Sequence, residues 1–140
     1  MKAAKANLRK VDTSVSHERV SISLQYITKD IDYRLERFKN DRQEFLSSLL
    51  AFYNCLLQIT SLSWVEFSLR RKTSGGYESI PAQKLKSAVR CPSIEESGKY
   101  ISCRFGDGDS FRIIGIKMHS DPTLYITGFD LDFSAYDHGS

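Results

Sequence analysis

Hydrophobic and polar positions alternate at the start of the readable part of the chain. The run VSISLQYI, residues 20–27, has apolar side chains at every second position, which is the period of a strand with one buried face. We interpret the run DIDYRLERF, residues 30–38, as a short helix. The pattern therefore predicts an N-terminal strand that leads into helical structure.

A longer helix is predicted next along the chain. Asn40 and Gln43 have the spacing of a capping box, and the apolar residues after them recur at intervals of three and four, which is the period of an amphipathic helix. We expect the apolar side to face a core. Its members are Phe45, Leu46, Leu49, Leu50, Tyr53, Leu56 and Leu57.

A second helix is predicted to begin at the sequence SWVE. Ser63 and Glu66 have the spacing at which each side chain accepts a hydrogen bond from the other's backbone N–H. The helix carries Trp64, which we expect in the core, and it ends by the TSGG sequence. Residues 75–98 are rich in loop-forming residues, with one further helical turn predicted at AQKLKSAV.

The last third of the chain reads as three strands, at residues 100–105, 111–118 and 123–131. They are joined by GDGDS and HSDP, which are short enough to close hairpins. The order predicts an α+β fold: an N-terminal strand, two to three helices, then a three-stranded antiparallel meander with the helices packed on one face. We expect residues 1–16 to form a flexible basic arm and residues 17–140 to form a single domain.

Composition adds only a few constraints on the class of protein. The 140 residues, 41% of them hydrophobic, suit one ordinary globular domain, and a net charge of +3 does not by itself predict nucleic-acid binding. The N-terminal segment lacks the about 7 to 15 apolar residues of a signal peptide, and no run approaches the roughly 18 needed to cross a bilayer. We therefore expect a cytoplasmic protein with no membrane partner.

The cysteines carry no recognisable metal or disulfide pattern. Cys55, Cys91 and Cys103 are odd in number, far apart and without a Cys-x-x-Cys pair. This spacing favours reduced thiols over a disulfide framework or a zinc site. We expect no metal and no cofactor in the protein.

A symmetric hairpin at GDGDS would place two arginines side by side. Phe105 then lies opposite Phe111, and Arg104 lies opposite Arg112 on the other face of the sheet. Neighbouring like charges cost stability unless an anion offsets them. That anion is either a bound phosphate or a nearby carboxylate, so the register predicts a candidate phosphate site and leaves a solvated edge as the alternative.

The end of the chain, DLDFSAYDHGS, suggests two chemistries and one structural role. Asp130 and Asp132 follow a buried strand and have oxygen ligands suited to Mg²⁺. In the second hypothesis Tyr136 and His138 transfer protons while Lys117 and the two arginines bind a phosphate. The aspartates then fix the turn that brings the tail back over the sheet. The structural alternative is a surface tail.

The segment ISCRFGDGDSFRIIGIKMHSDPTLYITGFDLDFSAYDH, with the order of elements before it, resembles the C-terminal half of the RelE/ParE-type toxins of bacterial toxin–antitoxin systems. In the ribonuclease branch of that family, basic residues on the sheet bind the scissile phosphate and a C-terminal Tyr or His contributes to catalysis. The resemblance implies that Arg112 is the central arginine, that Arg104 binds phosphate one strand earlier, and that Tyr136 or His138 is the terminal catalytic group.

The resemblance also implies a function. The ribonuclease branch implies a bacterial or phage-borne toxin that cleaves RNA without a metal, acts on ribosome-associated RNA and pairs with a cognate antitoxin. The ParE branch shares the fold but poisons a topoisomerase by binding. We therefore expect a metal-independent endoribonuclease, with a non-catalytic protein-binding module as the alternative. On the polar face of the meander, convergence of the arginines with Tyr136 and His138 in one concavity would favour the enzyme, and a flat apolar patch on that same face would favour binding.

Overall fold

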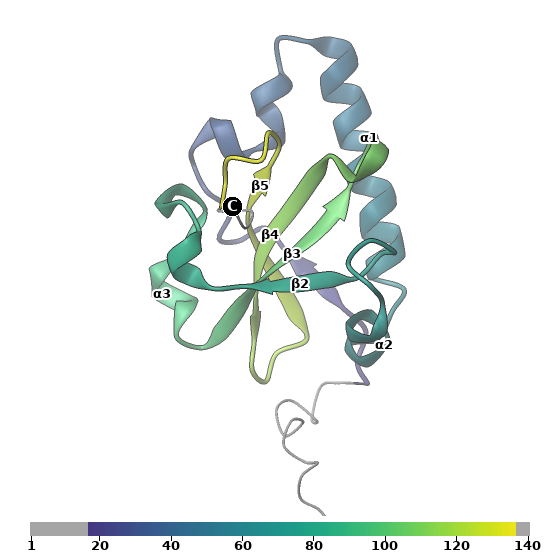
Figure 1. Cartoon of the computed structure of the whole chain (residues 1–140), viewed down its shortest axis with the longest axis vertical. Coiled ribbons are helices and arrows are strands. Elements are labelled where there is room, and N and C mark those ends of the chain that lie inside the picture. Colours follow the sequence, from purple (N-terminus) through teal and green to yellow (C-terminus); the bar gives the residue numbers. More distant parts are fainter. Residues whose placement is uncertain (1–16, 137–140) are drawn as a thin grey trace, which may run out of the picture.

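A computed structural model describes residues 17–136 of the chain, built around one mixed sheet of five strands (Figure 1). The sheet has the order β1-β5-β4-β3-β2. Strand β1 is parallel to β5, and the other neighbouring strands are antiparallel. The strands are β1 (Ser21–Ser23), β2 (Tyr77–Ile80), β3 (Gly98–Phe105), β4 (Phe111–Met118) and β5 (Thr123–Asp130).

The predicted α+β class is confirmed, and so is the register of the central hairpin. Arg104 pairs with Arg112 and Phe105 pairs with Phe111 across β3 and β4. The N-terminal strand is shorter than predicted, because β1 has only three residues and Leu24 is exposed after it. Strand β2 was not predicted, since its four residues lie in a stretch that reads as loop.

Two α-helices, α1 (Arg42–Ile59) and α2 (Trp64–Leu69), pack against one face of the sheet. The cap of α1 is Asp41, whose side chain accepts from the backbone N–H of Glu44, one residue later than predicted. The helix predicted at residues 30–38 is instead a pair of short 3₁₀ turns. Among the helices of residues 17–136, none combines the length and the apolar character needed to span a membrane.

The capping box of α2 is confirmed. The Ser63 hydroxyl accepts from the backbone N–H of Glu66 at 3.1 Å, and the Glu66 carboxylate accepts from the backbone N–H of Ser63 at 2.8 Å. These bonds satisfy two N–H groups that a helix start otherwise leaves free. They position Trp64, which is buried as expected and donates its indole N–H to the carbonyl of Pro122 at 2.6 Å.

Replacing Ser63 with Ala should lower the free energy of unfolding by about 1 kcal/mol, because the cap acceptor is lost. Urea denaturation measures this change. Ser68 is a matched control in the same helix, since its hydroxyl only donates to the carbonyl of Val65 at an exposed position. An equal loss of stability in Ser63→Ala and Ser68→Ala would contradict the capping role.

The second face of the sheet is also covered, so the helices are not confined to one face as predicted. A single helical turn was predicted at residues 82–89, but this stretch forms two 3₁₀ turns, η5 (Ala82–Lys84) and η6 (Ser87–Val89). The one-turn helix α3 (Pro92–Glu95) follows them. Together with the C-terminal segment they bury a second apolar cluster. Its members include Leu85, Val89, Ile94, Tyr100, Ile114, Ile116, Ala135 and Tyr136.

The side of α1 that faces the core differs from the predicted one. Ser48, Cys55 and Ile59 are buried, and Phe45 and Phe52 pack against the first core cluster. Phe52 lies 5.1 Å from Phe129 and 6.1 Å from Phe105, ring centre to ring centre. The aromatic stripe fills the space over the sheet, so the prediction was wrong for the exposed members Leu46, Leu49, Leu50, Tyr53 and Leu57.

Candidate functional site

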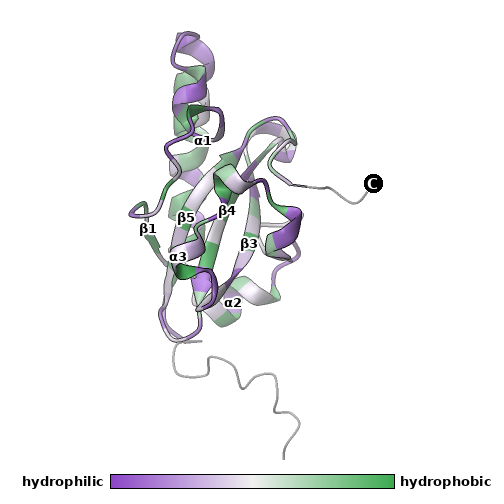
Figure 2. Ribbon diagram, turned by 90° about the vertical axis from the view of Figure 1, so that its left-hand side faces the viewer, coloured by the Kyte–Doolittle hydropathy of each residue, from purple (hydrophilic) through white to green (hydrophobic). Residues whose placement is uncertain are grey.

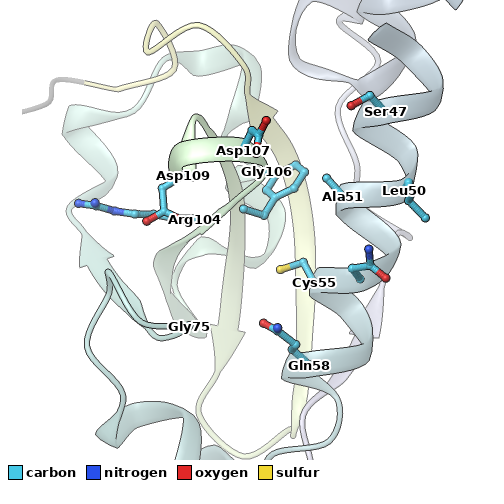
Figure 3. A pocket seen from close by; sticks show the side chains of 12 residues that line it. Ser47, Leu50, Ala51, Cys55, Gln58, Gly75, Arg104, Gly106, Asp107 and Asp109 are labelled. Atoms are coloured by element: carbon cyan, nitrogen blue, oxygen red, sulfur yellow. The ribbon is translucent and has the colours of Figure 1, made fainter. Parts of the chain in front are cut away.

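Two arginines meet on the face of the sheet that lies opposite α1. Arg104 and Arg112 are direct partners across the hairpin, and the Arg104 side chain points away from α1 (Figure 3). Arg112 is only 6% exposed. Its Nη1 donates to the carbonyl of Asp109 at 2.5 Å, and its guanidinium carbon lies 5.0 Å from the centre of the Phe133 ring. The Arg112 side chain is therefore held by protein contacts.

A carboxylate that the sequence did not indicate lies beside these arginines. Glu78 lies opposite Ser102 in the pairing of β2 with β3, and it accepts from Lys72 at 3.0 Å. Burial acts to raise the pKa of Glu78. The ammonium of Lys72, the Tyr136 hydroxyl and the charge of Arg104 outweigh burial, so the pKa of Glu78 lies below its usual value. Glu78 is thus ionised near neutral pH and offsets part of the positive charge.

The C-terminal segment turns back over this face because two aspartates fix its turn. Asp130 is fully buried and accepts from the backbone N–H groups of Ser134 and Ala135, at 2.9 and 3.2 Å. Asp132 accepts from Ser134 at 3.2 Å and forms an ion pair with Arg37 at 2.9 Å. Both carboxylates hold protein groups, as the turn hypothesis predicts. Within residues 17–136, no group of three or more His, Cys, Asp and Glu residues is placed to bind a metal.

The turn places Tyr136 beside the arginine pair. Its hydroxyl lies 3.2 Å from the Ser102 hydroxyl and donates to the Glu78 carboxylate at 3.2 Å. Burial raises the pKa of Tyr136, and the charge of Glu78 adds to this effect against the opposing hydrogen bonds from Ser102 and Arg112. The phenol therefore stays protonated near neutral pH, and it is suited to donate a proton rather than to accept one.

Lys117 does not belong to this group of residues. Its ammonium lies 5.1 Å from the centre of the Trp64 ring, on the side of the sheet that α2 covers. Successive residues of a strand point to opposite faces, so Lys117 and Arg112 cannot share one. The prediction that Lys117 binds the same phosphate as the arginines was wrong. His138 and the arm at residues 1–16 lie outside the described residues, and the predictions for them stay untested.

A cleft of about 470 Å³ lies on the other side of the hairpin, between α1 and the β3–β4 loop (Figure 3). Ser47 and Asn54 line it from α1, and Asp107 and Asp109 line it from the loop. Arg104 is also among its lining residues, although its side chain points away from α1, and neither Arg112 nor Tyr136 contributes to its walls. Arg112 and Tyr136 therefore share a face of the sheet, but this cleft does not contain them.

The most unusual surface of the described chain is the outer side of α1. Five large apolar side chains there are between 39% and 60% exposed, and we call them the apolar face: Leu46, Leu49, Leu50, Tyr53 and Leu57. Leu50 also lines the cleft beside the β3–β4 loop (Figure 3), and the N-terminal turns of α1 extend beyond the sheet (Figure 2). Contiguous exposed apolar groups of this kind mark interaction sites.

The sequence contains a signal for this face that periodicity alone does not reveal. Residues 45–59 include no Asp, Glu, Lys, Arg or His. A surface helix usually has charged residues on its outer side, whereas a helix that is apolar all round is buried on all sides. The composition of α1 therefore indicates two covered faces, of which the sheet supplies one.

Comparison of the chain with protein-family models, with curated proteins and with solved structures gave no match in any of the three. The geometry of the described residues is therefore what indicates a function. They offer two candidate surfaces, which are the arginine pair with Tyr136 and the apolar face of α1.

Proposed function

We propose that this chain is a protein-binding module whose binding surface is the apolar face of α1. The observation that supports the proposal is the exposure of that face on a helix whose other side is anchored in the core. Apolar area removed from water contributes roughly 25 cal/mol per Å², so covering these side chains favours association. The core side of α1 fixes the helix, and a partner would meet a surface that is already formed.

The chemistry of the face favours a protein partner over nucleic acid or an anionic membrane. Binding to nucleic acid depends on Lys and Arg that neutralise phosphates, and anionic lipids attract basic clusters in the same way. Residues 45–59 carry neither type of residue. Aliphatic side chains around a tyrosine, with uncharged polar neighbours, have the composition of a protein interface core.

Site-specific photo-cross-linking in cells tests this proposal. A benzoylphenylalanine at position 50 should give an adduct of discrete mass, because Leu50 is the most exposed member of the face. The control is position 69, since Leu69 is 80% exposed at the end of α2 and outside the face. Replacing both Leu46 and Leu57 with Asp should remove the adduct. Identical adduct patterns from positions 50 and 69 would contradict the proposal.

A second candidate function is metal-independent RNA cleavage of the RelE type. The meeting of Arg104, Arg112 and Tyr136 on one face supports it. In such a reaction the RNA 2′-hydroxyl attacks the adjacent phosphate and Tyr136 donates its proton to the departing 5′ oxygen. His138 would accept the proton of the attacking hydroxyl, and the arginines would stabilise the phosphate. Ribosome-associated RNA and a cognate antitoxin are the partners expected under this function.

Incubation of the purified protein with RNA tests the second function. If it holds, cleavage continues in EDTA and Tyr136→Phe lowers the rate by about 10²-fold or more. Tyr26→Phe is the control, because Tyr26 packs edge-on against Tyr125, which pairs with Ile116 and not with Arg112 on β4. Cleavage that EDTA abolishes, or that is equal in both tyrosine variants, would exclude this mechanism.

A further inference from the structure

We infer that the partner of the apolar face is a second copy of this chain, with the two α1 helices packed antiparallel. The inference rests on the proposed function, because it names the partner for the same surface. It is based on the spacing of the exposed side chains, on their symmetry and on the lack of charge around them.

The spacing of the exposed residues is that of a two-helix seam. Leu46, Leu50, Tyr53 and Leu57 follow one another at intervals of four, three and four residues, and each is more than half exposed. Alternating steps of four and three keep side chains facing a neighbouring helix. The core of the domain uses a different stripe of α1, so this seam is free to bind a second helix.

The same spacing is complementary to itself in the antiparallel direction. A two-fold axis between Leu50 and Tyr53 places Leu46 of one copy against Leu57 of the other, and Leu50 of one copy against Tyr53 of the other. The two outer layers then pair leucine with leucine, and the two inner layers pair leucine with tyrosine. A parallel pair would place the two Tyr53 rings against each other and align the two helix dipoles unfavourably, whereas antiparallel dipoles attract.

The lack of charged residues along α1 also favours a second copy of the chain as the partner. Arg42 and Glu44 are charged, but no Asp, Glu, Lys, Arg or His follows until Glu66. A two-fold pair therefore brings no like charges together along the seam. The residues beside it, Ser47 and Asn54, are exposed, uncharged and able to hydrogen-bond across an interface. Within residues 45–65, a partner with a charged rim would find no opposite charge.

The size and position of α1 suit a dimer of moderate affinity. The helix has 18 residues, and at about 1.5 Å per residue it is about 27 Å long. An interface built on one helix face is at the small end of specific interfaces, so we expect a dissociation constant on the order of micromolar. The N-terminal turns of α1 extend beyond the sheet (Figure 2), which leaves room for a second copy.

Sedimentation velocity on the full chain, over roughly 1 to 200 µM, tests the inference. The wild type should shift from monomer to dimer as the concentration rises. Leu50→Asp should remain monomeric over this range, with a dissociation constant raised at least about tenfold, because a charge at the seam is buried without a partner. Leu69→Asp is the matched control and should dimerise like the wild type.

A charge exchange tests the antiparallel register. Leu46→Glu alone and Leu57→Lys alone should each fail to dimerise. Mixed together, the two variants should form a heterodimer, because the antiparallel pair places the new carboxylate beside the new ammonium and leaves the other outer layer unchanged. Recovery is not expected in a parallel pair, where position 46 meets position 46.

The results of these experiments and of the cross-linking together show whether the antiparallel dimer, the protein-binding surface or both are wrong. A wild type that stays monomeric at 200 µM, or a mixture of the charge variants that does not associate, overturns the antiparallel second copy. If position 50 then still gives a discrete adduct with a different protein, the face binds proteins and only the partner was wrong. If position 50 gives no adduct either, both proposals fail.

Discussion

Replacing Asp130 with Ala is expected to lower the free energy of unfolding by about 3 kcal/mol and to release the C-terminal segment from the sheet. The carboxylate is fully buried and accepts from the backbone N–H groups of Ser134 and Ala135. Removing it takes the acceptor from the buried Ala135 N–H and leaves the Ser134 N–H with Asp132 alone, and an unsatisfied buried group costs about 1–3 kcal/mol. Tyr136 depends on the same turn for its position.

Urea denaturation and hydrogen exchange measure the two parts of this prediction. The amides of Ser134 and Ala135 should exchange much faster in Asp130→Ala. Asp132→Ala is the control, because Asp132 binds the same turn but has a side chain that is 41% exposed. It should cost less than about 1 kcal/mol. Equal losses in the two variants would show that Asp130 does not fix the turn.

The second prediction with a large effect concerns substitutions on the two sides of α1. Ile59→Ala is expected to lower the free energy of unfolding by about 3 kcal/mol, because Ile59 is 2% exposed and its removal leaves a cavity. Leu57→Ala is expected to change it by less than about 0.5 kcal/mol, since Leu57 is 53% exposed in the monomer. The measurement uses dilute protein, at which association does not contribute.

Whichever of the two substitutions lowers the free energy of unfolding more identifies the side of α1 that faces the core. If Leu57→Ala is the more costly change in dilute protein, the leucines face the core as the sequence pattern predicted. The apolar face would then be buried, and the proposed binding surface would not exist.

The central hairpin could be predicted because two independent signals agree there. The GDGDS loop is short, and successive side chains of a strand point to opposite faces, so a symmetric register places the phenylalanines on one face and Arg104 and Arg112 on the other. The same alternation is enough to separate Lys117 from Arg112. Glu78 could not be predicted, because it lies on a four-residue strand whose pairing depends on distant segments.

The rotation of α1 could not be predicted because the helix has two apolar stripes with the same period. One contains Phe45, Phe52 and Ile59, and the other contains Leu46, Tyr53 and Leu57. Periodicity cannot decide which stripe meets the sheet. The choice depends on the fit of Phe52 against Phe105 and Phe129, which only the folded chain brings together.

The cysteines allow a labelling experiment on the apolar face. Cys55 and Cys103 are buried, and burial raises the pKa of the Cys55 thiol to about 11. Thiolate is the reactive form, so neither residue should react readily in the native protein. Cys91 is partly exposed and would be replaced by Ser. A cysteine introduced at position 50 or 69 then becomes the reactive thiol of the described residues.

The most direct test of the account is the rate at which maleimide labels Leu50→Cys in cells that produce the protein, compared with the purified protein at high dilution. If a partner covers the apolar face, labelling in cells should be slower by about tenfold or more relative to Leu69→Cys, and dilution should restore it. If Leu50→Cys and Leu69→Cys keep the same ratio of rates in cells and after dilution, the face is not a binding surface.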